Sequence, residues 1–143
     1  MLRMTAAEVR RLGERRVPYS AAVLPGGGVI LTIPDLPPTL NDWQRWHWGK
    51  RAAETQRLTA ALCLLARAHH LPLLPRARAE CRYYFATKRR RDTPNYSYWK
   101  PFWDALVTAG LLADDDTAHL SVGEPMLLTD PLRPRSEVTL RPW

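Results

Sequence analysis

The sequence predicts an α+β fold, in which a small mixed sheet carries two main helices in the order β-α-β-α-β-β. Three observations predict it. With 45% hydrophobic and 24% charged residues, the 143-residue chain has the composition of a globular domain. Two stretches have the apolar or alternating pattern of strands, and two others place apolar residues at helical spacing. No glycine fingerprint of a dinucleotide-binding fold is present.

The first 27 residues predict a separate N-terminal segment. Thr5 and Glu8 match a capping box, in which each side chain satisfies an otherwise unpaired backbone N–H, so a short basic helix is expected up to about Arg16. Pro18 and the glycine run 26–28 then interrupt the pattern. We therefore expect residues 1–27 to form a basic helix and a Gly-rich linker, and residues 28–143 to form the main domain.

The first half of the main domain predicts a strand and then a long helix. Residues 29–33 are β-branched and apolar, as in a buried strand. Two prolines end this strand, and Thr39 or Asn41 is placed to cap the next segment. Between residues 50 and 69, leucines recur at helical spacing and predict an amphipathic helix.

The second half predicts a strand, a second helix and two strands. Residues 78–87 alternate, with Cys81, Tyr83 and Phe85 on the apolar face. Trp99, Phe102, Trp103 and Leu106 then follow helical spacing, and Gly110 is expected to end this helix. Strands are expected near residues 119–128 and 136–140. Cys63 and Cys81 have no partner at metal-ligand spacing and are interpreted as buried free thiols.

The charge balance favours a polyanionic partner. Twenty-one Lys and Arg residues against 14 Asp and Glu residues give a net charge of +7 and a pI near 10.0. The longest apolar stretch, residues 60–66, is far shorter than the roughly 20 residues that cross a bilayer. The N-terminus lacks an apolar signal core, so we expect a cytoplasmic protein with no membrane contact.

A run of cations leads directly into a carboxylate after the second strand. Lys88, Arg89, Arg90 and Arg91 precede Asp92. Such a run favours phosphate binding, although a solvated basic surface is the commoner explanation of a charge run. Asp92 and Asn95 flank the start of the next helical segment, and capping of that segment is the alternative to a chemical role.

Three consecutive aspartates come after the second helix. Asp114, Asp115 and Asp116 repel one another, and a cation would relieve this repulsion. Mg²⁺ prefers carboxylate oxygens, water and substrate phosphate as ligands, so a site that joins these residues with Asp92 would suit it. The alternative is a solvated acidic turn. The sequence leaves open whether the two acidic segments meet in space.

Aromatic and cationic residues alternate between positions 43 and 51. Trp43, Trp46, His47 and Trp48 are interleaved with cations that would track a nucleic-acid backbone while the rings stack on unpaired bases. Core or interface filling is the commoner role of tryptophan and remains the alternative. The three cations of this stretch are Arg45, Lys50 and Arg51.

The motifs of the second half, taken together and in order, resemble those of the RusA-type Holliday-junction resolvases. The residues that carry the resemblance are Arg90 to Asn95, Lys100, Phe102 to Leu106, Ala109 with Gly110, and Asp114 with Asp115. The earlier Pro37, Pro38 and Asn41 resemble the opening motif of that family. The resemblance extends over residues 29–140.

This resemblance implies a homodimeric, Mg²⁺-dependent endonuclease that resolves four-way DNA junctions in recombination and repair, with Mn²⁺ as an alternative ion. By position, Asp92 and Asp115 match metal-binding carboxylates, Asp114 matches their acidic neighbour, and Lys100 matches a required lysine. The expected catalytic set is thus Asp92, Lys100, Asp114 and Asp115, and Asp92, Asp115 and Asp116 are the expected metal ligands. The expected DNA contacts are Lys88, Arg89, Arg90, Arg91, Asn95, Arg45, Lys50 and Arg51.

One position departs from the family's pattern. Pro94 stands where the family has a second aspartate, and the segment from Asp92 to Lys100 is longer by two residues. Either Asp116 or a water replaces the missing ligand, or the protein binds branched DNA without cutting it. For Lys100, an ordinary helical ion pair with Asp104 is the alternative. A protein-interaction surface formed by the tryptophans is a third interpretation of the chain.

Overall fold

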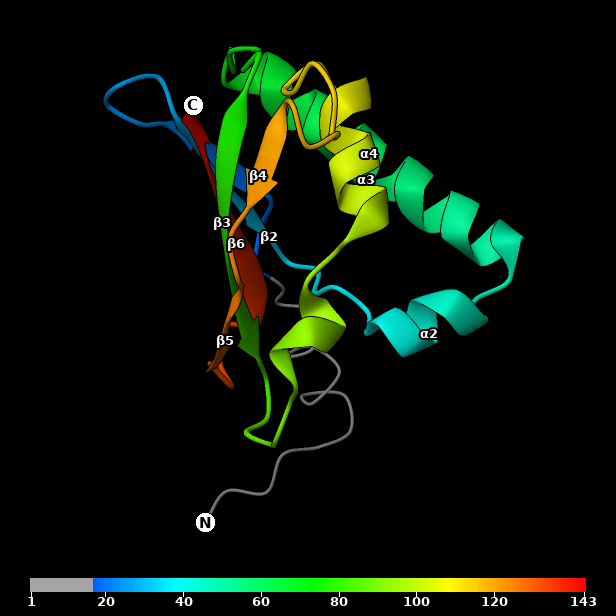
Figure 1. Ribbon diagram of the computed structural model, residues 1–143. Helices are drawn as coiled ribbons and strands as arrows, with labels where there is room; N and C mark the ends of the chain where they lie inside the picture. The colour runs from blue at the N-terminus through cyan, green and yellow to red at the C-terminus, as the bar shows by residue number, and fades with distance from the viewer. Residues whose placement is uncertain (1–16) are drawn as a thin grey trace.

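The computed structural model describes residues 17–143, in which one six-stranded mixed sheet is covered by helices on one face (Figure 1). The strands lie in the order β1-β2-β6-β3-β4, and β5 pairs with β3 beyond the end of β4. Two helices, α3 (Trp48–Ala68) and α4 (Lys100–Thr108), provide most of the helical layer. The predicted α+β class with two main helices is confirmed. The predicted N-terminal helix lies outside the described residues.

The glycine run forms the turn of a β-hairpin, so the predicted linker at residues 17–27 is wrong. β1 (Ser20–Val23) pairs antiparallel with β2 (Val29–Ile33), the predicted strand. Gly26 and Gly27 adopt φ values of 88° and 89°, a conformation that side chains disfavour. The backbone of this turn therefore requires glycine, and residues 17–27 belong to the same unit as the rest of the domain.

The core lies between the sheet and the two helices. Alternate residues of β3 (Ala77–Phe85) are buried, as the predicted alternation requires, and the predicted apolar face of α4 packs on them. The Trp99 ring stacks on Phe102 with centroids 4.8 Å apart and meets the Tyr83 ring edge-on at 6.2 Å. Cys81 is buried as predicted, whereas Cys63 is only partly buried; both are free.

Capping residues set the helix ends. Thr39 Oγ1 accepts a hydrogen bond from the Asp42 N–H, which confirms one of the two predicted caps and begins α2 (Leu40–Arg45). The His47 side chain caps α3, so this helix begins two residues earlier than predicted. Gly110 comes after α4 with a φ of 78°, as expected of a residue that ends a helix.

The region predicted as one strand at residues 119–128 is two short strands, β4 (Leu120–Val122) and β5 (Met126–Thr129). Both pair parallel with β3, and Pro125 between them has no N–H to donate to the ladder. β6 (Arg135–Pro142) fills the space between β2 and β3, antiparallel to both. Within residues 17–143, no helix is long and apolar enough to cross a membrane.

Candidate functional site

The three aspartates lie in a loop, residues 113–119, that we call the acidic loop. It connects the end of α4 to β4, and buried leucines anchor it on both sides, namely Leu111, Leu112 and Leu120. At its end, the His119 carbonyl accepts a hydrogen bond from the N–H of Ala77, the first residue of β3, at 2.8 Å. The acidic loop is therefore held against the N-terminal end of β3.

Within the acidic loop, Asp115 turns toward the start of α4. Its Oδ2 lies 3.6 Å from Lys100 Nζ and 3.5 Å from the Tyr98 hydroxyl. Lys100 also forms the alternative ion pair, with Asp104 Oδ1 at 2.9 Å. The hydrogen bond to Asp104 raises the pKa of Lys100, and the Asp115 charge adds to it. Lys100 is thus a fixed cation between two carboxylates.

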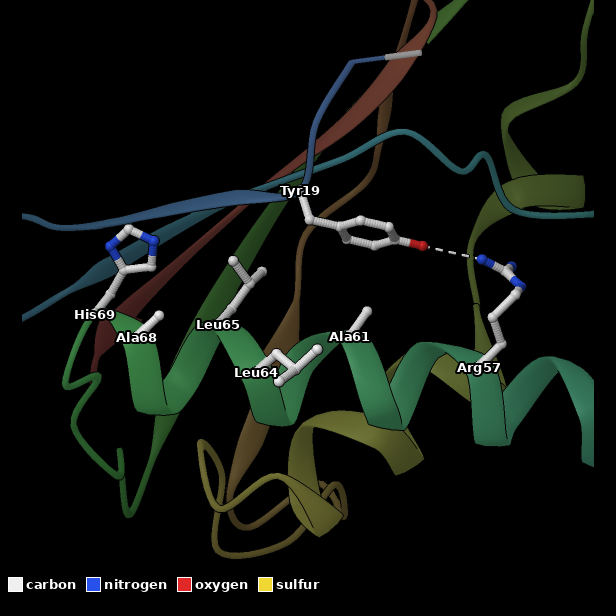
Figure 2. Close-up of a pocket in the computed structure, with 7 residues that line it drawn as sticks. All are labelled: Tyr19, Arg57, Ala61, Leu64, Leu65, Ala68 and His69. Atoms are coloured by element: carbon white, nitrogen blue, oxygen red, sulfur yellow. Dashed lines mark hydrogen bonds between the residues drawn. The ribbon is translucent and has the colours of Figure 1, made fainter. Parts of the chain in front are cut away.

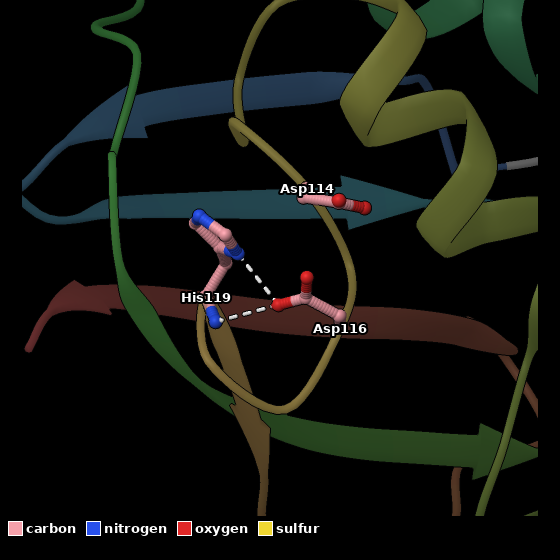
Figure 3. A group of neighbouring side chains, drawn as sticks. All are labelled: Asp114, Asp116 and His119. Atoms are coloured by element: carbon pink, nitrogen blue, oxygen red, sulfur yellow. Dashed lines mark hydrogen bonds and ion pairs between the residues drawn. The ribbon is translucent and has the colours of Figure 1, made fainter.

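Asp114 and Asp116 point to solvent and form a second group with His119 (Figure 3). One ligand atom from each of the three lies within 4.8 Å of the others. Among residues 17–143, this is the one group of three His, Cys, Asp or Glu side chains that could hold a metal ion. Asp116 Oδ1 accepts hydrogen bonds from His119 Nδ1 at 2.5 Å and from two backbone N–H groups. The bond from His119 lowers the pKa of Asp116.

His119 was missed by sequence reasoning. The signal was present, because Asp116 and His119 are three residues apart and a single helical turn or tight loop brings such a pair together. Imidazole suits transition metals better than Mg²⁺, whereas the carboxylates suit Mg²⁺ and Mn²⁺ alike. The group thus offers two carboxylates that suit Mg²⁺ or Mn²⁺ and one imidazole that suits a transition metal, and it does not by itself select the ion.

The basic run continues from β3 as an exposed loop, residues 87–92, that we call the basic loop. Lys88, Arg89 and Arg90 are exposed to solvent. Arg91 is not free, because its guanidinium lies 4.0 Å from the centroid of the Phe85 ring and donates to the Thr87 carbonyl at 3.0 Å. Three of the four predicted phosphate contacts are thus available to a ligand.

Asp92 ends the basic loop and lies outside the acidic group. Its carboxylate makes no capping hydrogen bond to the short 3₁₀ helix η1 (Thr93–Tyr96), although its carbonyl accepts from the Asn95 N–H at 3.0 Å. The basic loop leaves the C-terminal end of β3, and the acidic loop lies at the N-terminal end (Figure 1). Within residues 17–143, the group of three that is close enough to hold a metal contains neither Asp92 nor Asp115, so the expected metal set of Asp92, Asp115 and Asp116 is not assembled in this structure.

Pro94 shares a pocket with Glu124, a carboxylate that was not among the expected metal ligands. A pocket of about 270 Å³ separates η1, with Thr93, Pro94 and Ser97, from the break between β4 and β5, with Glu124. Glu124 lies 30 positions along the chain from Pro94, and no pattern in the sequence connects the two. Because β4 and β5 both pair parallel with β3, the break between them lies beside η1, and Pro94 and Glu124 line the same pocket.

The remaining predicted DNA contacts lie where α2 meets α3. Arg45 and Lys50 are exposed. Arg51 is used within the protein, since its Nε donates to the Trp43 carbonyl at 3.0 Å and a terminal nitrogen donates to the Gln44 carbonyl at 2.8 Å. Arg51 therefore binds the carbonyl end of α2, and its availability for DNA is reduced.

A further pocket, of about 710 Å³, lies between Tyr19 and α3 (Figure 2). Its floor is apolar, with Ala61, Leu64 and Leu65, and one end is closed by Arg57, which donates to the Tyr19 hydroxyl at 3.0 Å and to Asp35 at 2.8 Å. Burial, together with the bond to Asp35, raises the pKa of Tyr19 to about 12. This pocket contains none of the predicted site residues.

Comparison with known proteins leaves the family open. No protein-family model matches this chain, and no curated protein matches it either. The resemblance to the RusA-type resolvases therefore stays a prediction that rests on the motif residues themselves.

Proposed function

We propose that the protein is a Mg²⁺-dependent endonuclease that cuts branched DNA, including four-way junctions, by phosphodiester hydrolysis. The observation that supports this most is the contact of Lys100 with Asp115, 3.6 Å apart across 15 residues of sequence. The family resemblance assigns both residues to catalysis. This cation lies beside a loop that exposes two further carboxylates, Asp114 and Asp116.

Each part of this region has a chemical use in phosphodiester hydrolysis. Asp114 and Asp116 would hold the divalent cation, which supplies polarisation of the phosphate and activation of water. Lys100 stays protonated, since its pKa is raised, and can neutralise the negative charge that develops on the phosphate oxygens. Asp115 and Asp104 fix the position of the Lys100 ammonium group.

Binding of the DNA backbone is assigned to the exposed cations. Lys88, Arg89 and Arg90 offer point charges and forked donors for phosphates, and the net charge of +7 favours a polyanion. A chain of 16.4 kDa has limited surface for four duplex arms, so we propose that two copies act as a two-fold dimer on a two-fold substrate. Because the free thiols of Cys63 and Cys81 suit a reducing compartment, we place this activity in the cytoplasm.

A non-catalytic branched-DNA-binding protein is the second candidate. Two observations favour it: Pro94 provides no carboxylate, and Asp92 does not join the acidic group. Such a protein would keep the salt-dependent binding that the cations produce and would lack cleavage.

The experiment that separates the two candidates is a cleavage assay on four-way, forked and linear DNA in Mg²⁺, in Mn²⁺ and in EDTA. The endonuclease proposal predicts metal-dependent nicks in the branched substrates and none in EDTA. Binding without cleavage in either metal, together with cleavage by Pro94→Asp, would assign the wild-type protein to the binding class. Absence of DNA binding at low salt would contradict both candidates.

A further inference from the structure

The junction of α2 and α3, residues 43–51, forms a projecting elbow at the side of the molecule away from the sheet (Figure 1). It carries three tryptophans, whose surroundings differ. The rings of Trp43 and Trp46 pack together at 5.6 Å, and each is covered by a cation: Arg51 over Trp43 and Lys50 over Trp46. Both are partly buried.

Trp48, by contrast, is 75% exposed, the largest exposed fraction among the aromatic side chains within residues 17–143. The centroid of the His47 ring lies 5.1 Å from that of its indole, and the two rings are tilted by 40° rather than stacked. A large apolar ring in water gains free energy when another flat surface covers it. An open face of Trp48 is thus available to a ligand.

The backbone beneath Trp48 is held firmly. His47 Nδ1 accepts a hydrogen bond from the Gly49 N–H at 3.1 Å, and Arg51 ties α3 to the carbonyl end of α2. A Cβ at position 49 would lie 3.3 Å from His47 Nδ1, so glycine leaves room for this cap. The indole is therefore presented from the first turn of a 21-residue helix, on a braced elbow.

The charge around the elbow favours nucleic acid as the ligand. Residues 43–51 include Arg45, Lys50 and Arg51 and no acidic residue. Aromatic faces stack on bases while neighbouring cations contact the phosphates. In a paired duplex both faces of each base are already covered by the neighbouring bases, whereas a base at a fork or a branch has a free face.

We propose that Trp48 stacks on an unpaired base and thereby makes the protein select DNA with an open branch point over continuous duplex. Arg45 and Lys50 bind the phosphates that flank this base. This assignment rests on the proposed function, because it takes branched DNA as the ligand, but it concerns recognition and needs no cleavage.

The test measures dissociation constants for a forked DNA with unpaired bases and for a fully paired duplex of the same length, in EDTA. Stacking on one base contributes about 1–3 kcal/mol, so Trp48→Ala should weaken fork binding by about 5- to 140-fold and leave duplex binding unchanged. Trp48→Phe should restore most of the loss, because a phenyl ring also stacks. The matched control is Trp143→Ala, which removes another exposed tryptophan, 49% exposed and far along the chain from the elbow; this variant should change neither dissociation constant.

A second readout locates the contact on the DNA. With 2-aminopurine at the unpaired position, wild-type protein should change the fluorescence of the probe, and Trp48→Ala should abolish that change. Equal fork binding by wild type and Trp48→Ala would overturn the stacking role while leaving the endonuclease proposal in place. A shift of the sedimentation coefficient on Trp48→Ala without DNA would overturn it too, since Trp48 would then lie in a protein interface. Wild-type protein that binds neither DNA would contradict the proposed function itself.

Discussion

The acidic loop and the basic loop, at opposite ends of β3, hold their charges in different ways. In the acidic loop, two of the aspartates have a side-chain partner: Asp115 contacts Lys100, and Asp116 contacts His119. In the basic loop, Arg91 packs on Phe85 and binds the Thr87 carbonyl, while Lys88, Arg89 and Arg90 extend into solvent. The acidic loop thus holds charged groups at fixed positions, whereas the basic loop gathers several positive charges in solvent.

This difference suggests a different role for each loop, one in hydrolysis of DNA and the other in attracting DNA. Rate acceleration requires charged groups fixed where charge develops, whereas attraction of a polyanion requires only many like charges near its path. Under the proposed function, we therefore expect hydrolysis to depend on the acidic loop with Lys100 and DNA attraction to depend on the basic loop. Changes in the acidic loop should alter the cleavage rate, and changes in the basic loop should alter affinity and its salt dependence.

The largest effect is expected for Asp115→Asn. This change removes the carboxylate that contacts Lys100, so the single-turnover rate of junction cleavage in Mg²⁺ should fall by about 10²- to 10³-fold. Junction affinity and thermal stability should stay close to those of the wild type, since the Asp115–Lys100 contact is partly exposed. Asp104→Asn removes the nearer acidic partner of Lys100, at 2.9 Å, and should lower the rate as well. The larger loss is expected for Asp115→Asn because the family resemblance also makes Asp115 a metal-binding carboxylate.

A similar loss of cleavage is expected for Asp116→Asn if Asp116 replaces the ligand that Pro94 cannot supply. In that case Pro94→Asp should be tolerated or should raise the rate. The measurement is the same single-turnover assay with both variants. Full activity of Asp116→Asn would refute the replacement and leave Glu124, across the pocket from Pro94, as the next carboxylate to change.

A moderate effect on binding is expected for the double variant Arg89→Gln/Arg90→Gln. The slope of log affinity against log salt concentration should decrease in magnitude by about 2, roughly one for each lost phosphate contact. The cleavage rate at saturating protein should be unchanged, because neither guanidinium lies in the acidic loop. Arg67→Gln, an exposed arginine on α3, provides the control; an equal change of slope there would mean that the basic loop has no special part in binding.

The smallest effect is a pH dependence of stability from Asp116. The hydrogen bond from His119 lowers the pKa of Asp116 in the folded protein below its unfolded value of about 3.9. A group of this kind stabilises the fold above its unfolded pKa, and this contribution is lost as the pH falls through the folded pKa. The small difference in thermal midpoint between wild type and Asp116→Asn should thus be present above about pH 5 and vanish at lower pH. A difference that grows as the pH falls would contradict the assignment.

Local patterns predicted the core of the fold. The alternation in β3, the helical spacing of Phe102, Trp103 and Leu106, and the turn at Gly110 depend on neighbouring residues, and all three are confirmed, although the helix begins one residue after Trp99. The hairpin at residues 20–33 was missed because the same glycines that suit a linker also suit a turn with positive φ. Which of these forms depends on pairing with β2.

The candidate site depended on long-range geometry and was predicted less well. The sequence pointed to Asp114, Asp115 and Asp116 but gave no sign that Asp115 turns away from the other two. The family resemblance placed Asp92 with them, whereas the spacing alone left open whether the two segments meet. In the structure Asp92 is not a member of the group that Asp114 and Asp116 form with His119.

The most direct test of the acidic loop as the metal centre is a titration of ¹⁵N-labelled protein with Mn²⁺, in which the paramagnetic broadening of backbone amide signals is measured. The account predicts that the signals of residues 114–119 broaden first and that the Asp114→Asn/Asp116→Asn variant loses this selective broadening. Broadening that begins around Asp92 and Glu124 instead, or that spreads evenly over the exposed carboxylates, would contradict it.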